Sequence, residues 1–248
     1  MTLPQHLVPS LAGVVPGGVV TVDGDEAHHA VVVRRMRVGE QVTLADGVGA
    51  VATGEVCATS KRSFDVRVTA VDQVAEPTPA LTVVQALPKG DRGELAVEVL
   101  TEIGVGKIVP WAAARSVAVW KGERAAKSHA KWQSTAREAA KQARRSWHPV
   151  MSPLATTLEV RELVDGADLA VVLHEAATEP LGAIAVPDAG EILLVVGPEG
   201  GLTDEEVTGF VAAGAVAVRL GDEVLRTSTA GVAAAAALLA RTQRWGGR

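Results

Sequence analysis

Residues 191–206 read EILLVVGPEGGLTDEE, which is the most informative stretch of the chain. The apolar run at 192–196 is continuous, which is typical of a strand buried on both faces of a parallel sheet. It ends in the glycine-rich loop 197–201, where glycines can adopt positive φ and let a ligand approach the backbone. Thr203 and Glu206 then form the signature of a capping box, so we expect a helix to begin there.

A second unit of the same kind follows. Residues 215–220 predict a strand, and residues 224–231, VLRTSTAG, lead into an alanine-rich helix. Ligand atoms that become buried need hydrogen-bond partners, and the backbone of such loops offers them. The two loops together indicate one cofactor pocket built largely from backbone.

Composition limits the class of protein. The 248 residues allow one large or two small domains. With 48% hydrophobic but only 3% aromatic residues, we expect a core filled mainly by Val, Leu and Ala, and a subunit interface would add stability. The single Cys57 excludes an intrachain disulfide and a cysteine zinc cluster. His28 and His29 lack partners at ligand spacing, so we predict no metal site.

The chain shows no targeting or membrane signal. No basic flank and no sustained apolar stretch precede Pro16, as a signal peptide would require. The longest apolar run, 230–240, is too short to span a bilayer. We expect a soluble cytoplasmic protein with no membrane partner.

Positive charge is concentrated in one part of the chain, although the net charge is −5. Residues 115–148, the basic stretch, hold nine Lys or Arg against two acidic residues. Such a local excess suits phosphates, and the alternative is a solvated helix face. Tryptophans in the stretch could stack on bases, or could belong to a buried stripe at helical spacing. The residues concerned are Trp120, Trp132 and Trp147 for stacking, and Trp132, Ala136, Ala139, Ala140, Ala143 and Trp147 for the stripe.

The pattern divides the chain in two. Residues 1–74 are β-rich, and residues 42–45 and 51–56 predict a hairpin around Asp46-Gly47. Alternation at 64–68 predicts a half-buried strand, and one helix is expected from near Asp25 to Gly39. This pattern favours a compact β-barrel with a single helix. Residues 75–79, AEPTP, predict a linker.

Strands and helices alternate in residues 80–248, which indicates an α/β domain with a mostly parallel sheet. The pattern by itself favours an unknotted doubly wound sheet, because true knots are almost absent from proteins. The expected strands lie at 81–87, 107–110, 169–173, 192–196 and 215–220, and the first helix at 91–103, capped by Gly104. No G-x-G-x-x-G follows a strand, and GVGK at 104–107 lacks the spacing and hydroxyl of a phosphate loop.

Two motifs, GPEGG at 197–201 and LGDEVLRTSTA at 220–230, resemble the cofactor-binding end of the SPOUT methyltransferases. Four further motifs narrow the resemblance to the RsmE-type enzymes, which methylate N3 of a uridine in 16S ribosomal RNA. They are EAHH at 26–29, ALPKGDR at 86–92, EAAKQ at 138–142 and LHE at 173–175.

The resemblance implies a SPOUT-type parallel sheet with a deep trefoil knot, preceded by a small PUA-like β-barrel that binds RNA. It also implies S-adenosyl-L-methionine as cofactor, 16S ribosomal RNA or the small ribosomal subunit as partner, and a homodimer whose active site draws on both subunits. The expected cofactor residues are Leu173, His174, Gly197, Glu199, Gly200, Gly201, Leu220, Val224, Leu225, Thr227, Thr229 and Ala230.

Methylation of uridine N3 requires removal of the imide proton, so the enzyme must stabilise the anion, supply a base, or both. In the RsmE-type pattern the EAAxQ motif is followed by a small residue, glycine and arginine. Arg145 occupies that arginine position here, and Arg144 replaces the glycine. Arg145 is therefore the first candidate for substrate positioning. Glu138 could orient it or act as the base, and Arg226 is the other catalytic candidate.

The candidate RNA-binding residues are His29, Arg34, Arg35, Lys89, Arg92, Arg115, Lys127, Lys131 and Lys141. The chain departs from the RsmE-type pattern in two places. Ser228 stands where glutamate is usual, which argues against an essential carboxylate there, and Gln5-His6 replaces an early basic residue. Two alternatives stay open: methylation of a ribose 2′-hydroxyl or of another RNA, and a catalytically silent RNA-binding assembly factor.

Overall fold

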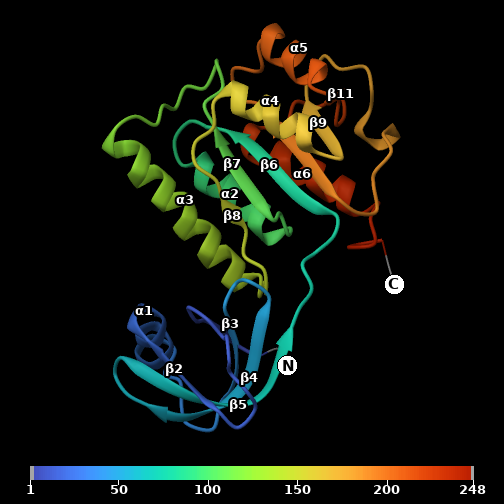
Figure 1. The fold of residues 1–248 in the computed structure, drawn as a ribbon. Helices are drawn as coiled ribbons and strands as arrows, with labels where there is room; N and C mark the ends of the chain where they lie inside the picture. The colour runs from blue at the N-terminus through green and yellow to red at the C-terminus, as the bar shows by residue number, and fades with distance from the viewer. Residues whose placement is uncertain (1–2, 247–248) are drawn as a thin grey trace. The chain divides into compact units, whose positions relative to one another are not determined.

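The computed structural model describes residues 3–246, and the chain divides into two compact units (Figure 1). The first unit comprises Met1–Glu76 with Ala140–His148, and the second comprises Pro77–Ala139 with Pro149–Arg248.

The first unit is built on a five-stranded sheet in the order β1-β3-β4-β5-β2. Its strands are β1 Gln5–Leu7, β2 Val19–Asp23, β3 Gln41–Ala45, β4 Ala50–Thr59 and β5 Ser63–Gln73. The predicted hairpin is confirmed, because β3 and β4 pair antiparallel. The alternation in β5 is confirmed as well, since Phe64, Val66 and Val68 are buried.

The helix of this unit is shorter than predicted. It consists of α1 Gly24–His28 and a π-helical turn, η1 His29–Val33. The chain then leaves the helix, because the N–H of Met36 bonds back to the carbonyl of Ala30 and Arg35 adopts a φ of 56°. The prediction that the helix extends to Gly39 is therefore wrong.

Residues Ala140–His148 pack with the first unit, although they follow the predicted linker in the chain. The indole N–H of Trp147 donates to the carbonyl of Val74 at 2.9 Å, and the carbonyl of Ser146 accepts from the N–H of Gly49 at 3.0 Å. Trp147 is thus a structural contact of the first unit that lies beyond the end of α3. It does not continue the predicted helical stripe.

A buried ion cluster fixes the same segment. The ammonium of Lys141 lies 2.6 Å and 2.7 Å from the two carboxylate oxygens of Glu26. Nδ1 of His6 lies 2.8 Å from Glu26 Oε1, and it donates because a carboxylate only accepts. Burial raises the pKa of Glu26, but the hydrogen bonds from His6 and Lys141 and the charge of Lys141 outweigh it and hold the pKa below its ordinary value.

The second unit contains a six-stranded sheet in the order β11-β9-β10-β6-β7-β8, and every pair is parallel. The strands are β6 Ala80–Ala86, β7 Lys107–Trp111, β8 Val150–Met151, β9 Leu169–Leu173, β10 Glu191–Val196 and β11 Val216–Val218. Its helical elements are α2 Arg92–Glu102, α3 Glu123–Gln142, whose last residues join the first unit, α4 Thr157–Gly166, α5 Asp204–Ala212, α6 Thr227–Leu239 and the short η2 Leu181–Ala183. The predicted parallel α/β architecture is confirmed.

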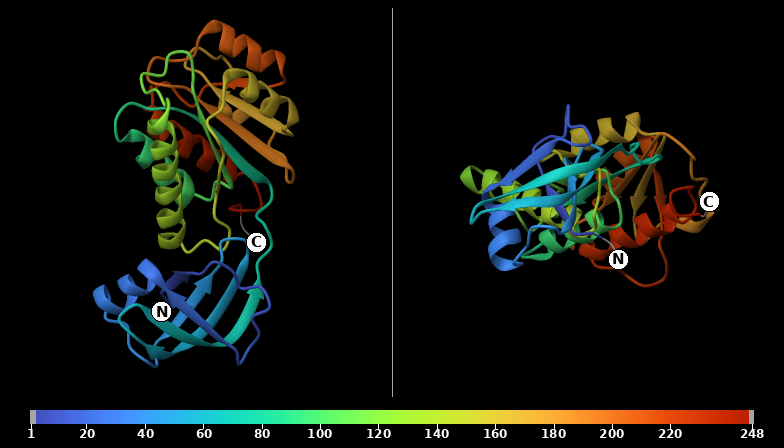
Figure 2. Two further views of the ribbon diagram at one scale, coloured as in Figure 1. Left: turned by 60° about the vertical axis from the view of Figure 1, so that its left-hand side comes forward. Right: turned by 90° about the horizontal axis from the view of Figure 1, so that it is seen from below.

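Alternate residues of the strands face two separate cores. One core lies under α2, α3 and α6 and contains Leu194, and the other lies under α4 and α5 and contains Val195. Figure 2 shows helices on both faces of this sheet. Strand β10 is therefore buried on both faces, as its continuous apolar run predicts.

Part of the predicted helical stripe is confirmed. Trp132, Ala136, Ala139 and Ala140 are buried on α3, and the Trp132 ring packs against Gly93. Ala143 is exposed, because α3 ends at Gln142. Trp132 is therefore a core residue that cannot stack on bases.

No helix within residues 3–246 is long and apolar enough to cross a membrane.

The end of α3 generates a prediction about stability. The N–H of Arg144 bonds to the carbonyl of Lys141 and that of Arg145 to the carbonyl of Ala140, which is a Schellman arrangement. Arg144 adopts a φ of 53°, a conformation that costs a non-glycine residue about 1–2 kcal/mol. We expect Arg144→Gly to raise the free energy of unfolding by about 1 kcal/mol in urea titrations. The control is Arg144→Ala, and an equal gain there would assign the effect to lost charge.

The Glu26 cluster generates a pH prediction. Because folding lowers the pKa of Glu26, its stabilising contribution is complete above the ordinary glutamate pKa and disappears as the pH falls through the lowered value. Glu26→Gln should lower the free energy of unfolding at neutral pH by roughly 3 kcal/mol, since it strands the Lys141 charge. It should also flatten the loss of stability in acid, measured by urea titration across pH. The control is Glu76→Gln at an exposed position, which should change neither the stability at neutral pH nor its loss in acid. If Glu26→Gln loses stability in acid as steeply as the wild type, the stabilising role of the Glu26 carboxylate is contradicted.

Candidate functional site

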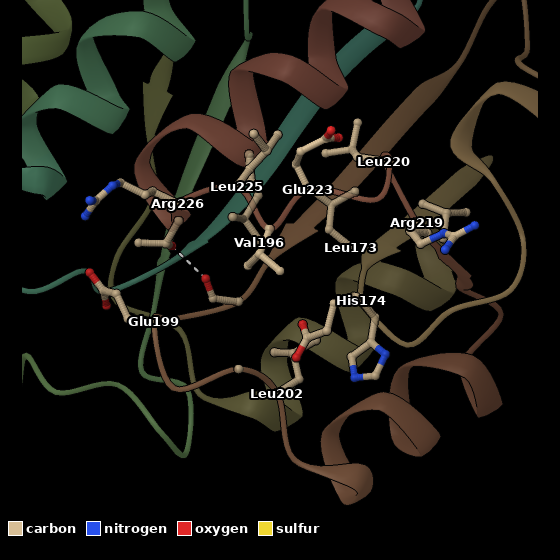
Figure 3. A pocket seen from close by; sticks show the side chains of 18 of the residues that line it. Leu173, His174, Val196, Glu199, Leu202, Arg219, Leu220, Glu223, Leu225 and Arg226 are labelled. Carbon is tan, nitrogen blue, oxygen red and sulfur yellow. Dashed lines mark hydrogen bonds between the residues drawn. The ribbon is translucent and has the colours of Figure 1, made fainter.

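A pocket of about 390 Å³ lies in the second unit at the carboxyl ends of β9, β10 and β11 (Figure 3). Three segments line it, namely 173–175 at the end of β9, 196–199 with 201–202 at the end of β10, and 218–227 with Ala230 at the end of β11. Parallel sheets bring the carboxyl ends of their strands to one edge, where ligands commonly bind. A cavity of this volume suits a small molecule.

Ten of the twelve predicted cofactor residues line this pocket. They are Leu173, His174, Gly197, Glu199, Gly201, Leu220, Val224, Leu225, Thr227 and Ala230. Gly200 and Thr229 lie in the same segments but are not among the lining residues. The structure thus brings together residues as far apart in the sequence as Leu173 and Ala230.

The hydroxyl group of Thr227 connects α6 to the residue after β10 and to β6 beneath the pocket. Thr227 Oγ1 donates to the carbonyl of Gly197 at 2.6 Å, the dashed line in Figure 3, and accepts from Gln85 Nε2 at 3.0 Å. Gln85 is fully buried in β6. Gln85 is not among the predicted cofactor residues, and its only signal in the sequence is an amide side chain inside the apolar run of 81–87.

The glycine loop needs its glycines for three reasons. Gly201 has a φ of 71°, which L side chains rarely adopt. A Cβ at Gly197 would lie 3.0 Å from the side chain of Leu202, and one at Gly200 would lie 3.0 Å from Arg115. The predicted capping box of Thr203 and Glu206 is confirmed at the start of α5.

Acidic groups prevail around the pocket. The lining includes four carboxylates against two guanidinium groups, and Arg219 pairs with Asp222 at 3.2 Å. Glu199 Oε1 accepts the N–H of Lys89 at 3.1 Å, which ties the glycine loop to the loop after β6. Leu173, Val196, Leu220 and Leu225 supply apolar surface between the charged ends (Figure 3). Apolar walls and excess negative charge fit S-adenosylmethionine, which carries an adenine and a sulfonium cation.

The catalytic candidates lie in different parts of the chain. Arg226 lines the pocket, and its carbonyl accepts the N–H groups of Thr229 and Ala230. Glu138 is exposed on α3. Arg145 belongs to the first unit, where Gln5 Nε2 donates to its carbonyl at 3.1 Å.

The predicted RNA-binding residues differ in their availability. His29, Arg34 and Arg35 are exposed in the first unit, whereas the Lys141 ammonium is engaged by Glu26. In the second unit Lys89, Lys127 and Lys131 are exposed and Arg92 is half-buried. Lys131 lies 3.0 Å from Glu94, and this hydrogen bond raises the pKa of Lys131. Arg115 donates to the carbonyls of Gly200 and Leu202.

Within residues 3–246 no three His, Cys, Asp or Glu side chains are placed to hold a metal ion.

The chain matches two families of RNA methyltransferase domains and is similar to named relatives. The RNA methyltransferase domain family matches residues 75–239, and the RNA methyltransferase PUA domain family matches residues 22–69. Two relatives are named ribosomal RNA small subunit methyltransferase E. That of Mycobacterium tuberculosis is 46% identical over 92% of this chain and 89% of its own. That of Bacillus subtilis is 31% identical over 90% of each chain.

Solved structures agree with the sequence comparison. The ribosomal RNA small subunit methyltransferase E of Neisseria gonorrhoeae, bound to S-adenosylmethionine, is similar with a TM-score of 0.85 at 30% identity, covering 97% of this chain and 98% of that one. A Legionella pneumophila methyltransferase in complex with the same cofactor has a TM-score of 0.86 at 28% identity, covering 98% of this chain and 99% of that one. The family predicted from the motifs is confirmed: the chain belongs to the ribosomal RNA small subunit methyltransferase E family of RNA methyltransferases.

Proposed function

We propose that this protein transfers the methyl group of S-adenosylmethionine to N3 of a uridine in small-subunit ribosomal RNA. The observation that carries the proposal is the pocket that GPEGG and LGDEVLRTSTA build at the carboxyl ends of β9, β10 and β11. Its lining suits this cofactor, and relatives of the same family were solved with the cofactor bound.

The bound cofactor supplies an electrophilic methyl group. The chain supplies the groups that hold it and the charge that the target base needs. Apolar residues such as Leu220 and Leu225 exclude water, while Arg226 places a cation at the pocket. A cation near O2 or O4 of the uracil lowers the energy of the N3 anion. Arg145 is the proposed second cation, and Glu138 is its proposed partner or the base.

We further propose that residues 1–74 form a PUA-like RNA-binding domain, that 75–79 link it to the rest, and that residues 80–248 form the methyltransferase domain. The order of the chain supports a deep trefoil knot in this domain. The chain passes from β10 to β11 on the far side of β9, and α6 then returns to contact β10 and β6.

A cytoplasmic homodimer completes the proposal. Val224 is 82% exposed and Leu225 is 42% exposed, although both are apolar and belong to the pocket segment. A second subunit that covers them would remove this apolar surface from water. Light scattering should give the mass of a dimer, and a fully active monomer at micromolar concentration would contradict this assembly.

The reaction is tested by mass-spectrometric mapping of ribosomal RNA from cells with and without the gene. We expect loss of one N3-methyluridine in small-subunit RNA, restored by the wild-type gene. Loss of a ribose methylation would favour a 2′-hydroxyl methyltransferase. Unchanged RNA, together with no cofactor binding at millimolar concentration in calorimetry, would leave a silent assembly factor.

The role of Arg145 generates a separate prediction. Because Arg145 is proposed to stabilise charge on the uracil, Arg145→Ala should lower the turnover rate by about 10² or more and leave cofactor affinity unchanged. Single-turnover kinetics and calorimetry measure these two quantities. The control is Lys127→Ala with Lys131→Ala, which should weaken RNA binding and reduce its salt dependence by at most about two ions, with turnover at saturating RNA preserved. Full turnover of Arg145→Ala would exclude the residue and leave Arg226 as the candidate.

A further inference from the structure

The segment after β7 packs against the outside of the glycine loop. Arg115 Nη1 donates to the carbonyl of Gly200 at 3.3 Å and to that of Leu202 at 3.1 Å. These two carbonyls flank Gly201, which lines the pocket. One guanidinium group therefore holds the backbone on both sides of a pocket residue.

The contact is close enough to explain the glycine at position 200. A Cβ there would lie 3.0 Å from both the Cβ and the carbonyl oxygen of Arg115. The φ of Gly200 lies outside the left-handed range, so its backbone conformation does not itself demand glycine. Gly200 is also absent from the pocket lining. Its small size is needed for the approach of Arg115 from behind the loop.

Glu206 makes a second contact between the same two segments. Its Oε1 accepts the N–H of Ala114 at 2.8 Å, while its Oε2 accepts the N–H of Thr203 at 2.9 Å in the capping box. The Glu206 side chain is buried, so a lost partner could not be replaced freely by water. Residues 114–115 thus hold the end of the loop, at Gly200 and Leu202, and the first turn of α5, at Glu206.

We propose that Arg115 is a positioning residue for the cofactor loop and not a ligand of RNA phosphates. This inference rests on the proposed function for the identity of the ligand, S-adenosylmethionine. A loop with three glycines has wide conformational freedom, and a ligand that binds a mobile loop must order it first. Arg115 restricts that freedom before the ligand binds. Loss of Arg115 should therefore weaken cofactor binding and leave RNA binding unchanged.

The experiment compares Arg115→Ala with Arg115→Lys and with Arg124→Ala, an exposed arginine of the same basic stretch. Calorimetry should show the Kd for S-adenosylmethionine raised about tenfold in Arg115→Ala, the scale of losing one charge-assisted hydrogen bond. Arg115→Lys should recover part of the affinity, because an ammonium can still donate to a carbonyl. Arg124→Ala should bind the cofactor like the wild type.

Kinetics and RNA binding separate positioning from phosphate contact. In Arg115→Ala, KM for the cofactor should rise while kcat at saturating cofactor stays within about twofold of the wild type. RNA affinity and its salt dependence should not change. An unchanged cofactor Kd, combined with weaker RNA binding and a salt slope reduced by about one, would overturn the proposal.

A second variant and hydrogen exchange test the positioning role of Arg115 separately from the identity of the ligand. Gly200→Ala, which forces the loop away from Arg115, should reproduce the loss of cofactor affinity without loss of RNA binding. Hydrogen exchange of the amides at 199–203 in the ligand-free protein should accelerate in Arg115→Ala and not in Arg124→Ala. Wild-type protein that binds no cofactor would refute the proposed function, whereas unchanged exchange at 199–203 would refute the positioning role by itself.

Discussion

The pocket depends on the hydroxyl of Thr227, which lies between the carbonyl of Gly197 and the amide of Gln85. This group joins the residue after β10, the carboxyl end of β6 and the first turn of α6, and so ties α6 to two strands that already pair in the sheet. Because buried donors and acceptors are costly to leave unpaired, the pair of hydrogen bonds fixes where α6 begins. The segment before α6, residues 220–226, is then held over the carboxyl ends of the strands as one wall of the pocket.

The opposite wall is held from outside by Arg115 and Glu206. The glycine loop has little side-chain surface of its own, so its shape must come from neighbours that bond its backbone. The Glu199 side chain adds a contact of another kind, since its carboxylate accepts the N–H of Lys89. The loop thus combines backbone freedom at Gly201 with external hydrogen bonds on both sides. This combination leaves backbone groups available to a ligand without leaving the loop loose.

Positive charge in the basic stretch serves more than one purpose. Lys141 is paired with Glu26 in a site that also holds His6, and Arg115, although exposed, donates to the glycine loop. Lys127 and Arg124 are exposed as well. A count of charges along the chain treats these residues alike. Their surroundings separate those that hold the fold together from those able to meet phosphates, because a desolvated, paired ammonium is no longer available to a solvent-side ligand.

The sequence by itself determined the elements whose signals are local. The apolar run of β10, the capping box of Thr203 and Glu206 and the alternation in β5 need only neighbouring residues, and each is present as predicted. The motif set also identified the family and ten of the pocket residues. Tertiary structure decided the partners of Gln85, Arg115 and Lys141, which lie 142, 85 and 115 residues away in the chain. It also decided that Trp132 is core and that Arg35 and Arg144 end their helices in a left-handed conformation. The periodicity of a strand and the cap of a helix depend only on residues close together in the sequence. The hydrogen-bond partner of a side chain depends instead on which distant segments come into contact when the sheet forms.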